Sequence, residues 1–225
     1  SPSDAESRTL TMIPFFKNYY LDYGFLGEGW SLLIYIPVVI FIVTAVSNAV
    51  NLTDGLDGLA GGISAIVATV LAIIAYVSGR VDFSEFLNIL YLPGAQELTI
   101  FATAMFGACL GFLWYNTHPA QVFMGDTGSL ALGGLIAALA LMLHKELLLP
   151  IICGVFFFET VSVIMQTSWF KYTKKKFGEG QRLFLMAPIH HHFEKKGWSE
   201  PTIVIRFWII AVILALIGLS TLKLR

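Results

Sequence analysis

Four polar side chains recur at steps of three residues near the end of an apolar stretch, namely Asn48, Asn51, Asp54 and Asp57. On a helix, residues three apart lie on one face, so this spacing gathers amides and carboxylates on one side. Two neighbouring carboxylates bind a hard cation or share a proton. A glycine follows each aspartate and lets the backbone approach a ligand closely. The alternative interpretation is a helix-ending turn, because Asn, Asp and Gly are also common turn residues.

A second polar string, FMGDTGS, occupies residues 123–129 and leads into another apolar stretch. The free N–H groups and the positive dipole end of a helix that begins here suit a phosphate. Beside them, Asp126 is placed to hold a Mg²⁺ ion that bridges phosphate oxygens. Alternatively, one of Asp126, Thr127 and Ser129 caps the helix, and the other two remain free for a ligand.

Three consecutive histidines, His190, His191 and His192, form the third polar group. Adjacent residues cannot all face one way in regular structure, and zinc sites use other spacings of histidine. Imidazoles near a phosphate therefore fit the run better. Glu159 and Gln166 are seven residues apart in an apolar stretch and share one helical face. For these two, a structural hydrogen bond between helices and a catalytic role both remain open.

The elements that must carry these groups are membrane-spanning helices. Hydrophobic residues make up 56% of the 225-residue chain and charged residues 13%, about half the usual charged share of a soluble domain. A chain this apolar cannot bury its surface in one core, so we predict an all-α, polytopic membrane protein. Roughly 20 apolar residues cross a bilayer as a helix. Six stretches qualify, at about 31–50, 59–78, 98–116, 129–143, 147–169 and 203–222.

Two of these segments need a separate comment. Residues 1–30 are rich in aromatic side chains and are predicted as an interfacial, extracytoplasmic segment, with 31–225 as the transmembrane catalytic domain. The stretch 129–143 is short for a bilayer core of about 30 Å, so we expect one of its ends to lie in a protein-lined recess.

Chain parity places the loops 51–58, 117–128 and 170–202 on one face of the membrane, because the chain changes sides at each span. All three polar groups lie on this face. The positive-inside rule assigns the face to the cytoplasm, since the third loop concentrates seven of the 14 basic residues in one segment: Lys171, Lys174, Lys175, Lys176, Arg182, Lys195 and Lys196. The sequence therefore predicts one cytoplasmic site built from three loops.

Composition argues against other kinds of site. The net charge of −1 gives no global field for a nucleic acid, so no nucleic-acid partner is expected. Cys109 and Cys153 both lie in apolar stretches, where we interpret them as packing residues.

Three strings together resemble one known family: NAVNLTDGLDGLA at 48–60, FMGDTGSLALGG at 123–134 and APIHHHFEKKGW at 187–198. They are similar to those of the polyprenyl-phosphate N-acetylhexosamine-1-phosphate transferases, and the histidine string is similar to the phospho-N-acetylmuramoyl-pentapeptide transferases among them. The resemblance implies transfer of phospho-N-acetylmuramoyl-pentapeptide from its UDP-linked form to undecaprenyl phosphate, which makes lipid I and UMP in peptidoglycan synthesis. It also implies that the protein uses Mg²⁺ as cofactor, forms a homodimer, and is embedded in the lipid bilayer of the bacterial cytoplasmic (inner) membrane.

The resemblance also implies roles for individual residues. Asp126 resembles the Mg²⁺ ligand, and Asp54, Asp57, His190, His191 and His192 resemble catalytic groups. Substrate-binding roles are implied for Asn48, Asn51, Asn116, Phe123, Gly125, Ser129 and Gln166. The family has ten membrane helices and an adjacent aspartate pair that acts on the lipid phosphate, but no such pair occurs in these 225 residues. The chain resembles the C-terminal portion of the enzyme, and we do not expect it to be active alone.

Three alternative functions remain beside this one, namely a related hexosamine-1-phosphate transferase, a transporter and a non-catalytic scaffold. Transporters are typically built from inverted repeats around a site at the bilayer midplane. Here the polar residues gather on one face and the sequence shows no internal repeat, which favours the transferase.

Overall fold

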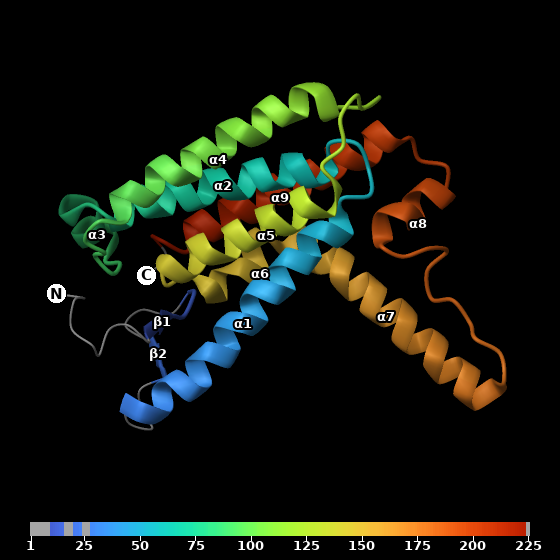
Figure 1. Ribbon diagram of the computed structural model, residues 1–225, viewed down its shortest axis with the longest axis horizontal. Helices are drawn as coiled ribbons and strands as arrows, with labels where there is room; N and C mark the ends of the chain where they lie inside the picture. The colour runs from blue at the N-terminus through green and yellow to red at the C-terminus, as the bar shows by residue number, and fades with distance from the viewer. Residues whose placement is uncertain (1–9, 16–19, 24–27, 224–225) are drawn as a thin grey trace.

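The computed structural model describes residues 10–15, 20–23 and 28–223, and most of them are helical (Figure 1). Five of these helices are long and apolar enough to cross a membrane: α1 (Glu28–Thr53), α2 (Leu59–Ser78), α4 (Ala95–Asn116), α5 (Gly125–Met142) and α9 (Glu200–Ser220). A bent pair supplies a sixth span, in which η3 (Glu146–Leu148) and α6 (Leu149–Ile152) meet α7 (Gly154–Phe177) at 80°. The prediction of an all-α, multi-pass membrane protein with about six spans is confirmed.

The smaller elements lie at the ends of the bundle. Helix α3 (Val81–Leu87) follows α2, and α8 (Ile189–Lys195) precedes α9. Strands β1 (Leu10–Met12) and β2 (Tyr20–Asp22) form an antiparallel hairpin. The hairpin docks on the turn after α5, where the buried Thr11 hydroxyl donates to the buried carboxylate of Glu146. Most of the predicted interfacial segment 1–30 lies outside the described residues, so that assignment stays a prediction.

Helix α2 forms the centre of the bundle, packed against both α4 and α9. In an apolar 18-residue segment of α2, 72% of the residues are buried, whereas the corresponding share is 17–33% in the other four straight spans. Small residues let neighbouring helices approach closely in membranes. At Gly62, an added Cβ would lie only 2.1 Å from the Trp208 ring of α9, so the indole occupies the space that a side chain would need.

Helices α1 and α5 pack equally closely. An added Cβ at Gly133 of α5 would lie 2.5 Å from Ser47 Cα and 2.8 Å from the Val46 carbonyl oxygen of α1. The Ser47 hydroxyl donates to the Leu130 carbonyl over 2.7 Å at the same crossing. This contact sets the spacing between the two helices that carry Asn51 and Asp126.

The structure changes two of the predicted spans in ways that matter for the site. Helix α5 begins at Gly125 rather than at residue 129, which brings Asp126 into its first turn. The stretch 147–169 is not one straight span, because the chain bends at Cys153. Gly154 follows the bend, and an added Cβ there would lie 2.7 Å from Leu214 of α9, so the glycine permits the close approach.

The third predicted loop, 170–202, is largely helical. Helix α7 continues to Phe177 and ends at Gly178, whose φ of 80° favours glycine. Lys174, Lys175 and Lys176 lie in its last turn, where positive charge interacts favourably with the helix dipole. The loop therefore consists of a helix end, a segment at 178–188, the short α8 and a turn into α9.

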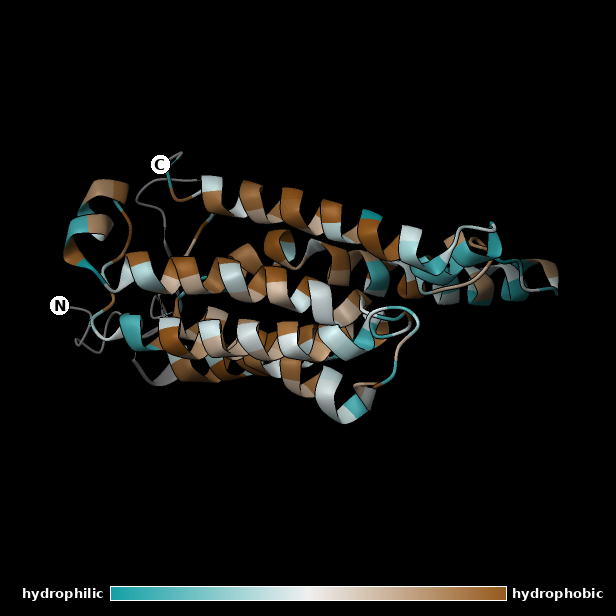
Figure 2. Ribbon diagram, turned by 90° about the horizontal axis from the view of Figure 1, so that it is seen from above, coloured by the Kyte–Doolittle hydropathy of each residue, from teal (hydrophilic) through white to brown (hydrophobic). Residues whose placement is uncertain are grey.

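Hydropathy separates the middle of the bundle from its ends. Figure 2 shows hydrophobic residues along the long helices and hydrophilic ones gathered at their ends, with a large group where α7 and α8 lie. Figure 1 places the end of α1, the start of α9 and helix α8 at this same end. The polar residues of the three predicted loops are therefore brought to one end of the bundle.

Candidate active site

The first part of the site joins the end of α1 to the start of α5. The Asn51 amide donates to Asp126 Oδ1 over 3.0 Å and to Ser129 Oγ over 2.9 Å. The buried Ser129 hydroxyl in turn donates to the Gly125 carbonyl over 3.1 Å. These contacts hold the Asp126 side chain in the first turn of α5 while the residue stays exposed.

Asp54 shares this corner. Burial raises its pKa above the ordinary value, and the negative charge of Asp126 raises the pKa further. A divalent cation beside Asp54 and Asp126 would neutralise both carboxylates, so this corner is a fitting environment for one. The available donors are carboxylate and amide oxygens, the type that Mg²⁺ prefers. The residues present therefore fit a Mg²⁺ ion, which Asp126 and Asp54 would hold.

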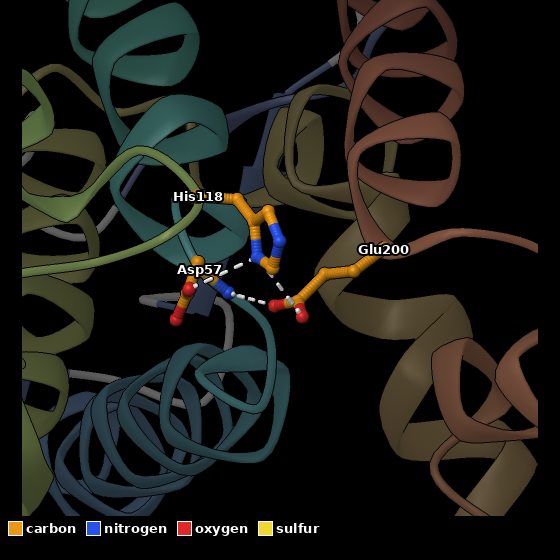
Figure 3. Close-up of side chains that lie close together, drawn as sticks. All are labelled: Asp57, His118 and Glu200. Carbon is orange, nitrogen blue, oxygen red and sulfur yellow. Dashed lines mark hydrogen bonds and ion pairs between the residues drawn. The ribbon is translucent and has the colours of Figure 1, made fainter.

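Asp57 lies in a second corner, between the α1–α2 loop, the α4–α5 loop and α9 (Figure 3). Its Oδ2 accepts the backbone N–H of Ala120 over 2.9 Å and lies 3.3 Å from His118 Nδ1. The carboxylate of Glu200, the first residue of α9, accepts the backbone N–H of Asp57 over 2.6 Å. Glu200 was missing from the residues singled out in the sequence, because only the folded chain brings α9 to this loop.

Asn116 and Phe123 belong to the same junction but face differently. Asn116 is 5% exposed. Its side chain accepts the Gly58 N–H over 2.9 Å and donates to the Val122 carbonyl over 2.8 Å, which ties two loops together. Phe123 is 74% exposed, so its ring offers a free apolar face beside this junction.

The three histidines point in different directions, as adjacent residues on a helix must. His190 is completely buried, and its Nδ1 lies 3.0 Å from Oε2 of the equally buried Glu159. The His190 ring also packs against Gly55, where an added Cβ would lie 2.4 Å from Nε2. His191 pairs with Glu194, and His192 Nδ1 accepts the Leu185 N–H over 3.1 Å. The buried His190 therefore joins α7 and α8 to the α1–α2 loop.

Two residues predicted to bind substrate are engaged elsewhere. The Gln166 carbonyl oxygen accepts the N–H groups of Leu183 and Phe184 over 3.0 and 2.8 Å, and its amide donates to the Phe184 carbonyl. Gln166 thus fixes the segment before α8. The Asn48 amide donates to the Thr44 carbonyl one turn earlier on α1. Among the described residues, neither side chain makes a recorded contact with the aspartates, and their substrate-binding roles stay predictions.

Comparisons with known proteins agree with the resemblance read from the motifs. A sequence model of glycosyl transferase family 4 matches residues 10–144, more than half of the chain. A phospho-N-acetylmuramoyl-pentapeptide-transferase of Chloroherpeton thalassium is 62% identical over 215 residues, which cover 96% of this chain and 56% of that protein. Its counterpart in Flavobacterium johnsoniae is 56% identical over 227 residues, covering 98% and 55%. The chain thus spans a little over half the length of the curated relatives it matches.

Proposed function

The chain belongs to glycosyl transferase family 4, and from this premise we propose that it forms the cytoplasmic site of a phospho-N-acetylmuramoyl-pentapeptide transferase. The enzyme would move phospho-N-acetylmuramoyl-pentapeptide from UDP to undecaprenyl phosphate, giving lipid I and UMP. Relatives with that name are 56–62% identical to the chain. The observation that carries the proposal is the meeting of Asn51, Asp126 and Ser129 at the polar end of a membrane bundle.

In this proposal, Asp126 holds Mg²⁺ and Asp54 supports it, because their carboxylates share one corner and repel each other without a cation. A Mg²⁺ ion bound there would supply Lewis-acid catalysis, because it would neutralise the diphosphate of the nucleotide and stabilise UMP as a leaving group. Asn51 orients the Asp126 carboxylate through its amide. The exposed Phe123 ring stacks on the nucleotide base.

The reaction joins two anions, so positioning and charge neutralisation matter more than covalent help from the protein. An oxygen of the lipid phosphate attacks the phosphorus that bears the sugar. The bond from that phosphorus to the oxygen of the UMP phosphate breaks, and UMP leaves with the electron pair. His191 and His192, both partly exposed on α8, donate hydrogen bonds to the phosphates. Recovery of a phosphorylated protein after incubation with the UDP-linked substrate alone would contradict this direct transfer.

We further propose that the polar end faces the cytoplasm of a bacterial inner membrane and that the protein works as a homodimer. The basic residues of α7 and α8 support that orientation through the positive-inside rule. Because the chain spans only a little over half the length of these relatives, we expect these residues alone to be inactive. Activity is therefore tested in the protein expressed from its complete reading frame.

The test is the release of radiolabelled UMP in detergent. The proposal predicts release that requires the UDP-linked substrate, undecaprenyl phosphate and Mg²⁺ together. A transporter or a scaffold releases none. A related hexosamine-1-phosphate transferase releases UMP from UDP-N-acetylglucosamine instead, so the two sugar nucleotides are compared in parallel.

A further inference from the structure

Asp57 is held by two side chains from distant parts of the chain. His118 follows α4, and Glu200 begins α9. Figure 3 shows His118 between the two carboxylates, with its Nδ1 lying 3.3 Å from Asp57 Oδ2 and 3.3 Å from Glu200 Oε2. Glu200 Oε1 accepts the backbone N–H of Asp57 over 2.6 Å. One residue is thus fixed both at its backbone and at its carboxylate.

These contacts use only one side of the Asp57 carboxylate. Oδ2 accepts from the Ala120 N–H and lies against His118. In Figure 3 the other oxygen of Asp57 points away from His118 and Glu200. With one oxygen held and the backbone held, the second oxygen has a defined direction.

The cluster also connects this loop to the histidine run. Glu200 lies just after a turn in which the Trp198 ring stacks on Phe193 of α8, with ring centroids 4.6 Å apart. On the other side of the same loop, Gly55 packs against the buried His190. The loop that carries Asp54 and Asp57 is therefore supported by both α8 and α9.

We propose that Glu200 and His118 are positioning residues that fix the direction of the Asp57 carboxylate for phosphoryl transfer. This assignment rests on the proposed function, and it gives a catalytic consequence to two residues that the motifs do not include. The three donor residues lie close enough to hold a cation. However, Glu200 Oε1 and Asp57 Oδ2 each already accept a backbone N–H. These contacts favour a clamp, in which Glu200 and His118 hold Asp57 in place, over an ion site.

The test compares Glu200→Ala with Glu97→Ala. Both acids lie in the first turn of a spanning helix, but Glu97 is exposed and belongs to α4. Hydrogen bonds to charged acceptors are stronger than neutral ones, so the loss of the bond from the Asp57 N–H should lower kcat roughly 10- to 100-fold in Glu200→Ala. We expect an unchanged KM for the nucleotide substrate and no effect of Glu97→Ala.

A double-mutant cycle separates positioning from general damage. If Glu200 acts through Asp57, Glu200→Ala adds almost nothing to the loss already caused by Asp57→Asn. His118→Ala should behave in the same way in the Asp57→Asn background. Losses that multiply in full, or a kcat near the wild-type value for Glu200→Ala, would overturn the assignment.

A measurement that needs no turnover keeps this inference apart from the proposed function. In hydrogen–deuterium exchange, Glu200→Ala should speed exchange of the amides at 54–58, because the Asp57 N–H loses its acceptor, and Glu97→Ala should not. If the wild-type protein releases no UMP, the proposed function fails. If exchange at 54–58 is unchanged by Glu200→Ala, the clamp fails whatever the activity.

Discussion

Replacing Gly133 with alanine should separate the two helices that build the Asp126 corner. The added Cβ would lie 2.5 Å from Ser47 Cα, 2.8 Å from the Val46 carbonyl oxygen and 3.0 Å from the Ser47 nitrogen. All three atoms belong to the backbone of α1, so no side-chain rotation can relieve the clash. Helices α1 and α5 must move apart by about 1 Å to reach ordinary contact near 3.5 Å.

The size of the effect follows from where this crossing lies. Overpacking of this kind costs about 1–3 kcal/mol, partly offset because alanine favours a helix over glycine by about 1 kcal/mol. One turn away, Asn51 reaches Asp126 over 3.0 Å and Ser129 over 2.9 Å. A displacement of about 1 Å takes both beyond hydrogen-bonding distance. Gly133→Ala should therefore lower Mg²⁺ affinity as well as stability.

The matched control is the neighbouring Gly134, where an added Cβ meets nothing within 4 Å. Thermal unfolding in detergent and the Mg²⁺ dependence of UMP release are measured for both variants. Gly134→Ala should unfold at or above the wild-type temperature and keep its Mg²⁺ dependence. If Gly133→Ala matches Gly134→Ala in both assays, the close α1–α5 contact does not position the site.

Three further outcomes are expected. The raised pKa of Asp54 means that the folded state binds its proton more tightly than the unfolded state. Without divalent cations, the free energy of unfolding should therefore fall as the pH rises from the ordinary Asp pKa of 3.8 through the raised pKa of Asp54. In thermal unfolding, Asp54→Asn should show a weaker dependence of stability on pH. Thr11→Val should destabilise the protein by about 1–3 kcal/mol, because the buried Glu146 loses the hydrogen bond from Thr11; an unchanged unfolding temperature would contradict this. Gly62→Ala should lower the unfolding temperature through overpacking of the α2–α9 contact, and a wild-type value would show that the contact yields freely.

Hydropathy alone predicted the spans, because each needs only its own run of apolar residues to be recognised. Parity then predicted that three separate loops share one end, and the contacts of Asn51 with Asp126 and of Gly58 with Asn116 agree with that arrangement. These conclusions depend only on local composition and on the fact that the chain changes membrane face at each span.

The details that the sequence did not predict arise from contacts between distant segments. At the bend near Cys153, Gly154 lies close against Leu214 of α9, a contact that no single stretch reveals. The burial of His190 depends on Glu159 and Gly55, from two other elements. An acid such as Glu200 at the start of a helix has a common local explanation in the helix dipole, so its contact with Asp57 becomes visible only in the folded chain.

The most direct test of the proposed Mg²⁺ site is the metal dependence of Asp126→Asn in the protein expressed from its complete reading frame. Asp82→Asn is the control, since Asp82 is exposed and pairs with Arg80 beside α3. We predict that Asp126→Asn unfolds at the wild-type temperature but loses Mg²⁺-dependent UMP release by several orders of magnitude, while Asp82→Asn keeps it. Turnover by Asp126→Asn at the wild-type rate, with the wild-type Mg²⁺ dependence, would remove Asp126 from the metal site and contradict the account.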